Sequence, residues 1–231
     1  MREVVVDTET TGLDPASGHR IVEIGAIELF NHVATGRFFH CYLDPQRDVP
    51  AEAFAVHGLS AAFLNGKPLF ADVADAMLQF FGDSPLVIHN AAFDLGFLNK
   101  ELERISGGAI ARERCVDTLE LARRKFPGAP ANLDALCRRY QIDISDRSVH
   151  GALKDAKLLA RVYLELRGGR EPGLAFVPTQ TRRLTGIDAS AWIPKLVPPT
   201  AAECEAHHKF IDSINDALWK RIEDTADQAL A

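Results

Sequence analysis

Cysteine is scarce in this chain, and its four occurrences lack the spacing of a metal site. Cys41, Cys115, Cys137 and Cys204 are scattered over 231 residues and never form a C-x-x-C pair. This distribution argues against a zinc site and against a disulfide framework. It suits a reducing compartment, so we expect a cytoplasmic protein.

Long hydrophobic runs and a basic leader are also absent. No apolar run approaches the roughly 18 residues that a membrane-spanning helix needs. The N-terminus meets Glu3 and Asp7 at once, without the basic and then apolar pattern of a secretory signal. We therefore expect no association with a membrane.

The chain has no excess of positive charge. Its 26 Lys and Arg residues are outnumbered by 32 Asp and Glu residues, which gives a net charge of −6. A protein that grips duplex DNA by itself usually shows a basic face. Any contact with nucleic acid should therefore be small, assisted by metal or arranged by a partner.

The remaining composition is that of an ordinary globular protein, and its pattern predicts an α/β fold. Three β-branched residues, Val4–Val6, predict a first strand that is buried on both faces. Further strands are expected at 21–29 and 37–43, as an antiparallel meander, and then at 86–88 and 115–116. Helical periodicity follows at 70–81, 95–105, 119–126, 133–140 and 150–166. This order predicts a mixed sheet, with an antiparallel meander plus parallel strands, flanked by helices.

The composition of the sequence changes after Gly168, where prolines become frequent. We expect a catalytic domain at residues 1–168, a linker at 169–200 and a C-terminal helix within 201–231 that extends to about Thr225. Apolar residues would share one face of that helix: Phe210, Ile211, Ile214, Leu218, Trp219 and Ile222. A single helix cannot bury such a face alone, so it packs back on the domain or docks on another protein, and we favour docking.

Two carboxylates, Asp7 and Glu9, end the first predicted strand. Residues i and i+2 of a strand point to the same side, with Cα atoms about 6.5 Å apart. Two neighbouring acids repel each other and are costly to desolvate, so a fold tolerates them best around a cation. Hard oxygen ligands favour Mg²⁺ or Mn²⁺ over zinc. A D-x-E pattern alone leaves open an exposed strand end with two solvated acids.

Three further residues, Asp94, His150 and Asp155, complete a candidate constellation. Asp94 lies just past a predicted strand, where open α/β sheets place their sites. Asp155 lies near the start of the last helix of the domain. His150 precedes it by five residues and would not share its helix face, so we place His150 on the preceding loop, folded over the site.

Together these residues suit in-line hydrolysis of a phosphodiester. Four converging acids can hold two divalent ions about 3.5–4 Å apart. A neutral His beside a metal-bound water can take its proton near pH 7. Each residue alone also has a plain structural reading: Asp94 as a helix N-cap, Asp155 as a solvated helix acid, and His150 as a loop histidine bonded to backbone.

Three segments resemble the exonuclease motifs of the DnaQ-like family. They are residues 5–12 (VVDTETTG), 87–94 (VIHNAAFD) and 150–156 (HGALKDA), and the H-x-x-x-x-D spacing matches the histidine subclass of that family. The resemblance covers about residues 3–167 and implies a ribonuclease-H-like fold. It implies that Asp7, Glu9 and Asp155 ligate metal, that Asp94 helps to hold a second Mg²⁺ or Mn²⁺ ion, and that His150 is the general base.

Within the family, the chain resembles the proofreading 3′→5′ exonucleases of bacterial replicative polymerases. Residues 53–58 (AFAVHG), residues 131–137 (ANLDALC) and Trp219 support this closer match. The resemblance implies that Thr10, Glu52 and His57 contact the terminal nucleotide of a single-stranded or frayed DNA 3′ end. The products would be 5′-mononucleotides.

The same resemblance implies two protein partners. The C-terminal residues 201–231 would bind the alpha subunit of DNA polymerase III. Residues 171–176 match a weak motif for the beta sliding clamp, but Glu171 replaces its Gln, so a plain linker with two apolar residues, Leu174 and Phe176, is the alternative.

Two rival functions are weighed against proofreading. One is a free-standing member of the family that trims RNA or short oligonucleotides and needs no helix after a linker. The other is a scaffold without catalysis that only bridges clamp and polymerase, although all five acid and base positions are filled.

Overall fold

A computed structural model describes residues 1–145, 149–169 and 198–215. The chain divides into two compact units, Met1–Ala175 and Phe176–Ala231. The first unit contains a five-stranded sheet with strand order β3-β2-β1-β4-β5. Its strands are β1 (Arg2–Thr10), β2 (Ile21–Phe30), β3 (Val33–Tyr42), β4 (Leu86–Ile88) and β5 (Cys115–Asp117).

The sheet is mixed, as the strand pattern predicts. β1 pairs antiparallel with β2, and β2 with β3, which confirms the meander. β4 pairs parallel with β1 and with β5. Asn31 and His32 join β2 to β3 and both have positive φ, at 50° and 68°. A two-residue turn of this kind matches the twist of the strands that it connects.

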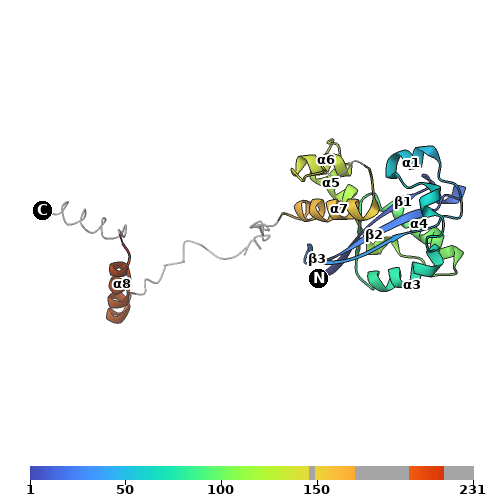
Figure 1. Ribbon diagram of the computed structural model, residues 1–231. Helices are drawn as coiled ribbons and strands as arrows, with labels where there is room; N and C mark the ends of the chain where they lie inside the picture. Colours follow the sequence, from blue (N-terminus) through green and yellow to red (C-terminus); the bar gives the residue numbers. More distant parts are fainter. Residues whose placement is uncertain (146–148, 170–197, 216–231) are drawn as a thin grey trace, which may run out of the picture. The chain divides into compact units, whose positions relative to one another are not determined.

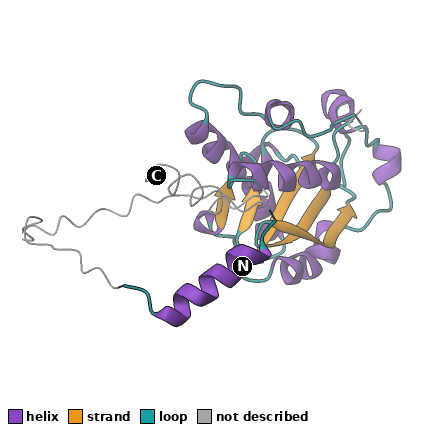
Figure 2. Ribbon diagram, turned by 90° about the vertical axis from the view of Figure 1, so that its left-hand side faces the viewer, coloured by secondary structure: helices purple, strands orange, loops and turns teal. Residues whose placement is uncertain are grey.

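Helices cover both faces of this sheet (Figures 1 and 2). They are α1 (Ala51–His57), α2 (Ala61–Leu64), α3 (Phe70–Phe81), α4 (Ala91–Arg104), α5 (Thr118–Lys125), α6 (Leu133–Arg139) and α7 (Ala152–Leu166). Short 3-10 turns lie at Pro15–Ser17 and Arg112–Arg114. The four-residue α2 is too short for periodicity to reveal. In the described parts of the chain, every helix is too short or too polar to cross a membrane.

Strand β1 is the centre of two cores. Val4 and Val6 face one side and pack with residues of α3 and α4, including Phe81 and Leu98. Val5 faces the other side and packs with Leu159 and Tyr163 of α7 together with their neighbours. Since all three valines are fully buried, the prediction of a strand covered on both faces is confirmed.

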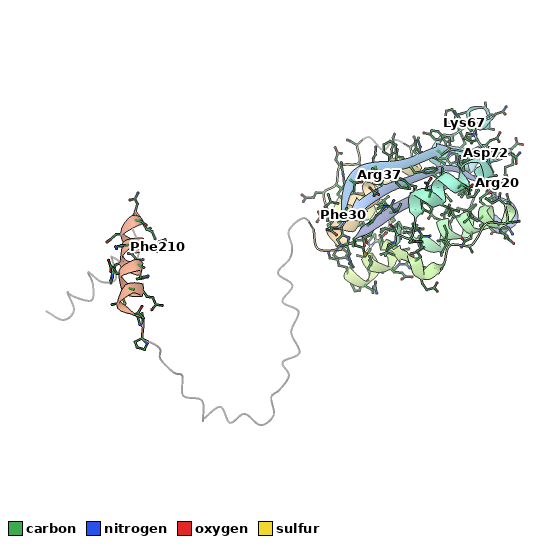
Figure 3. The ribbon with its side chains drawn as sticks, turned by 90° about the horizontal axis from the view of Figure 1, so that it is seen from below. Arg20, Phe30, Arg37, Lys67, Asp72 and Phe210 are labelled. Atoms are coloured by element: carbon green, nitrogen blue, oxygen red, sulfur yellow. The ribbon has the colours of Figure 1, made fainter. Side chains whose placement is uncertain are left out.

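The second unit contains α8 (Ala201–Ser213), which begins at the N-cap Thr200. The prediction of one helix running to about Thr225 is wrong at Ile214, whose backbone is extended (φ −91°, ψ 123°). The Ser213 hydroxyl donates to the carbonyl of Phe210, a local bond that competes with continued helix. Phe210 projects from α8 and is 63% exposed (Figure 3).

Several expected features lie outside the described residues. They are the clamp-binding segment 171–176 and the apolar residues Leu218, Trp219 and Ile222 of the tail.

Candidate active site

Asp7 and Glu9 lie on the sheet face that α7 covers. They alternate with Thr8 along β1 and follow Val5, which packs against α7. In the antiparallel register Asp7 is opposite Gly25, and Glu9 is opposite Glu23. The register shifts between Glu9 and Thr10, so the regular ladder ends at the second carboxylate. The strand therefore presents both acids side by side where its pairing breaks off.

Gly25 brings the start of α7 onto the sheet beside Asp7. A Cβ atom at Gly25 would lie 2.3 Å from the carbonyl carbon of Ala152 and 2.3 Å from the nitrogen of Leu153. Any side chain at this position would therefore push the helix away. Asp155, one turn into α7, is 3% exposed. Close packing of helix on strand thus carries Asp155 towards the end of β1.

Glu9, His150 and Asp155 form a compact group of potential metal ligands. One ligand atom from each lies within 4.8 Å of the others. His150 Nδ1 is 3.2 Å from Asp155 Oδ2. As predicted, His150 lies on the loop before α7, whose N-cap is Gly151. Its backbone N–H donates to the carbonyl of Val56 in α1 at 3.1 Å, which fixes the loop against that helix.

Asp94 lies in the first turn of α4 and is held by β1. Its Oδ1 accepts hydrogen bonds from the backbone N–H of Thr8 (3.0 Å) and from the Thr8 hydroxyl (2.7 Å). Burial raises the pKa of Asp94 to about 7, although both bonds from Thr8 act to lower it. Asp94 is therefore a carboxylate whose ionised form the protein leaves poorly compensated.

The alternative reading of Asp94 as an N-cap is wrong, since Asn90 occupies that position with φ 62°. Asp117 caps the helix instead, because its carboxylate accepts from the N–H groups of Asn90 (3.1 Å) and Ala91 (3.0 Å). It also accepts from Leu119 N–H at the start of α5 (2.9 Å). One side chain thus fixes two helix starts beside the sheet edge.

A pocket of about 600 Å³ opens beside the carboxylates. Thr10, Glu52 and His57, the three residues expected to contact substrate, all line it, together with Glu9 and Phe93. The Thr10 hydroxyl donates to the carbonyl of Gly12 at 2.6 Å. The pocket combines apolar walls with a few polar groups, as small-ligand sites do.

His57 lines this pocket as a neutral ring whose proton is turned towards the backbone of Thr10. Its Nδ1 accepts from Leu59 N–H at 3.0 Å, so the ring proton lies on Nε2. That Nε2 is buried near the backbone of Thr10 and forms no well-aligned hydrogen bond within the described part of the chain. Burial lowers the pKa of His57, so the ring is neutral at pH 7.

Sequence reasoning missed four residues that position this site. Thr8 lies within the first motif, but its hydrogen bonds to Asp94 were not predicted. The bonds that Asp117 accepts from Asn90 and Ala91 were not predicted either. Gly25 and Glu23 lie on the strand opposite the motif. Their importance depends on cross-strand register, which local sequence pattern does not give.

Comparisons with known proteins show the family to which this chain belongs. The family model described as "Exonuclease" matches residues 4–163. The DNA polymerase III subunit epsilon of Rickettsia felis is 49% identical over 224 residues, covering 93% of this chain and 97% of the relative. The protein of the same name from Escherichia coli is 41% identical over 236 residues, covering 95% and 97%.

Solved structures show the same architecture. Exonuclease X in complex with 5′ overhanging duplex DNA superposes with a TM-score of 0.56 at 26% identity, covering 71% of this chain and 90% of that one. The nuclease domain of 3′hExo, a DEDDh family member bound to rAMP, gives a TM-score of 0.61 at 18% identity, covering 72% and 91%. The second likeness supports the fold alone.

Proposed function

The chain belongs to the exonuclease family, and from this premise we propose that it is the proofreading 3′→5′ exonuclease of a bacterial replicative DNA polymerase. The observation that carries the proposal is the grouping of Glu9, His150 and Asp155 within 4.8 Å, beside a nucleotide-sized pocket. Relatives named DNA polymerase III subunit epsilon match nearly the full length of the chain.

The donor set fits two divalent cations. Asp7, Glu9, Asp94 and Asp155 would hold them, and carboxylate oxygens are the ligands that Mg²⁺ and Mn²⁺ prefer. The raised pKa of Asp94 supports this fit, because a nearby cation would stabilise its ionised form. When bound, the ions would acidify an attacking water and offset charge on the phosphate.

In the proposed mechanism, the chain's own residues hold the nucleotide and move the proton. The pocket that contains Thr10, Glu52 and His57 receives the terminal nucleotide, and these three residues contact it. His150 takes the proton of the attacking water at Nε2, since its Nδ1 is engaged with Asp155. The new P–O bond forms as the bond to the 3′-oxygen of the preceding nucleotide breaks, which releases a 5′-mononucleotide.

The domain plan expected from sequence belongs to the same proposal. Residues 1–168 form the exonuclease domain, 169–200 the linker and 201–231 the segment that binds the alpha subunit. Residues 171–176 contact the beta sliding clamp. The exposed Phe210 on α8 supports docking of this segment, and the protein would work in the cytoplasm, where the replicative polymerase works.

An exonuclease assay with a 3′-mispaired primer annealed to a template tests the proposal. We expect release of the mispaired 5′-mononucleotide in Mg²⁺ or Mn²⁺ and no release in excess chelator. Absence of release in either metal would refute the catalytic proposal. Faster degradation of an RNA oligonucleotide of the same sequence would favour the free-standing RNA-trimming enzyme instead.

A pull-down with the polymerase alpha subunit tests the role of the tail. Deletion of residues 177–231 should abolish capture of alpha and leave the exonuclease rate unchanged. Undiminished capture would refute the assignment of the tail as the binding segment. Loss of nuclease activity would show instead that the tail is part of the catalytic fold.

A further inference from the structure

A buried acid that belongs to none of the three motifs lies next to the metal-binding group. Glu23 on β2 is directly opposite Glu9 and is 3% exposed. Directly opposed residues of an antiparallel pair share one face of the sheet, with Cβ atoms about 4.5–5.5 Å apart. Two opposed acids repel each other unless something compensates one of them.

His40 on β3 provides that compensation. Its Nε2 lies 2.7 Å from Glu23 Oε1, a bond in which the ring N–H donates to the carboxylate. The imidazole packs edge-on against Tyr42, with ring centroids 4.8 Å apart, and Tyr42 packs edge-on against Phe63 at 5.1 Å. The aromatic row fixes the ring of His40 and therefore the direction of its bond.

The second oxygen of Glu23 borders the loop that carries His150. A Cβ atom on Gly151 would lie 3.7 Å from Glu23 Oε2 and 4.0 Å from Oε1. The loop is therefore held on two sides. Glu23 lies next to Gly151 on one side, and the His150 N–H donates to the carbonyl of Val56 on the other. Ala152 rests on Gly25, two residues along β2 from Glu23.

We propose that Glu23 and His40 form a positioning pair that sets the place of His150 in the exonuclease site. His40 holds the Glu23 carboxylate, and the carboxylate supports the backbone at Gly151, so the general base keeps its orientation over Glu9 and Asp155. This inference rests on the proposed function, because it assigns residues to the same reaction. Neither residue touches the substrate pocket, so the effect reaches the chemistry only through His150.

The substitution His40→Leu tests the pair in the full-length protein, assayed with a mispaired primer in Mg²⁺. Removing a partner that orients an active-site residue typically costs about 10–100-fold in activity, and we expect that loss in kcat with KM changed less than about threefold. His40→Gln keeps an N–H donor and should recover most of the rate. Where His40→Leu lowers the melting temperature too far, Glu23→Gln, which keeps the shape of the side chain, should show the same fall in kcat.

The pair His32–Glu3 provides a matched control. His32 Nδ1 lies 2.6 Å from Glu3 Oε2, and Glu3 is 1% exposed, so the bond is as short and as buried. It belongs to the same sheet, at the end away from the carboxylates. His32→Leu should lower the melting temperature but leave kcat within about twofold of wild type.

A double-mutant cycle separates positioning from general destabilisation. In a His150→Ala background the substitution His40→Leu should cost less than about threefold, because there is no base left to misplace. An equal loss in both backgrounds, or a His40→Leu enzyme within about twofold of wild type, would overturn the proposal. A wild-type protein without nuclease activity would instead overturn the proposed function, which the same assay shows separately.

Discussion

Two buried acids at opposite ends of the sheet, Glu28 and Asp94, receive different partners from the protein. At the end where Phe30 and Arg37 lie (Figure 3), each buried carboxylate has strong partners from the protein. Glu28 accepts from Arg2 at 2.6 Å and from Arg37 at 3.0 Å. Glu3 accepts from the Tyr163 hydroxyl at 2.6 Å as well as from His32. At the other end, Arg20 pairs with the buried Glu101 at 2.6 Å and His40 with Glu23 at 2.7 Å, but Asp94 receives its bonds from Thr8, a neutral donor.

The pKa values record this difference. Bonds from Arg2 and Thr35 lower the pKa of Glu28, whereas burial raises that of Asp94 to about 7. Burial is the largest cause at Asp94, whereas at Glu28 the bonds from Arg2 and Thr35 outweigh it. Glu28 is paired with two arginines of the protein, whereas the hydrogen bonds to Asp94 come from the neutral Thr8. The fold thereby holds an unfavourable group at the place where a metal ion would relieve it.

Removal of a carboxylate at the site end should have the largest effect. Asp7→Asn deletes a proposed metal ligand, and we expect the exonuclease rate to fall about 10⁴-fold or more, because the charge stabilisation supplied by bound metal is worth several kcal/mol. Glu3→Gln, at the far end of the same strand, should leave the rate within about threefold and cost stability only. Rates measured on mispaired primer decide the comparison. Equal losses in both variants would show that the two ends do not differ in role.

Replacement of the proposed general base, His150, should give the next largest loss of exonuclease rate. His150→Ala should lower turnover by about 10²–10⁴-fold, the usual contribution of a positioned general base. Binding of Mn²⁺, followed by calorimetry, should be largely kept, since four carboxylates remain. A variant with wild-type turnover would remove His150 from the mechanism.

A methyl group at Gly25 should have an intermediate effect on stability and activity together. Gly25→Ala forces the start of α7 away from β2, because the added Cβ would lie 2.3 Å from backbone atoms. Overpacking of this kind typically costs about 1–3 kcal/mol, and displacement of Asp155 should lower the rate as well.

Gly96→Ala is the control for that variant. The added Cβ meets only Pro15 Cγ, at an ordinary 3.8 Å, and the position lies within α4. An alanine there should be neutral or stabilising, by up to about 1 kcal/mol. Chemical denaturation of both variants measures the difference. A Gly25→Ala protein as stable as Gly96→Ala would show that close contact of α7 with β2 is not needed.

The sequence alone predicted those site residues whose placement depends on their neighbours along the chain. The strand that carries Asp7 and Glu9 follows from its run of β-branched residues. The loop position of His150 follows from its five-residue spacing to Asp155, which would put the two on different faces of a helix. Glu23 and His40 could not be found that way, because what they do depends on which residues face them across two strand pairs. The end of α8 was also predicted wrongly. The helical spacing of apolar residues continues past Ser213, but the backbone at Ile214 is extended and no longer helical. Periodicity reports which face is apolar and not where a helix stops.

The smallest effect, on stability alone, tests the contrast between the two ends most directly. In metal-free protein, Asp94→Asn should raise the melting temperature at pH 8, because the folded state then no longer holds an ionised carboxylate with a raised pKa. Ionisation destabilises the fold only as pH rises from the unfolded value near 4 towards 7 and above, so the gain should shrink at pH 5. One kcal/mol corresponds to about 2–4 °C in a protein of this size, and we expect a rise of at least that amount.

Glu28→Gln should behave in the opposite sense. A carboxylate with a lowered pKa contributes stability above its unfolded value and loses it as pH falls through the folded one. The variant should therefore be destabilised at pH 8 and approach wild type as the pH drops below 4.5. Melting curves in chelator at several pH values measure both variants. Saturating Mn²⁺ should reverse the sign at the site end only, because the cation then favours the ionised Asp94 that the asparagine lacks. Shifts of the same sign at both ends in chelator would mean that the site end does not store the charge imbalance inferred from its geometry.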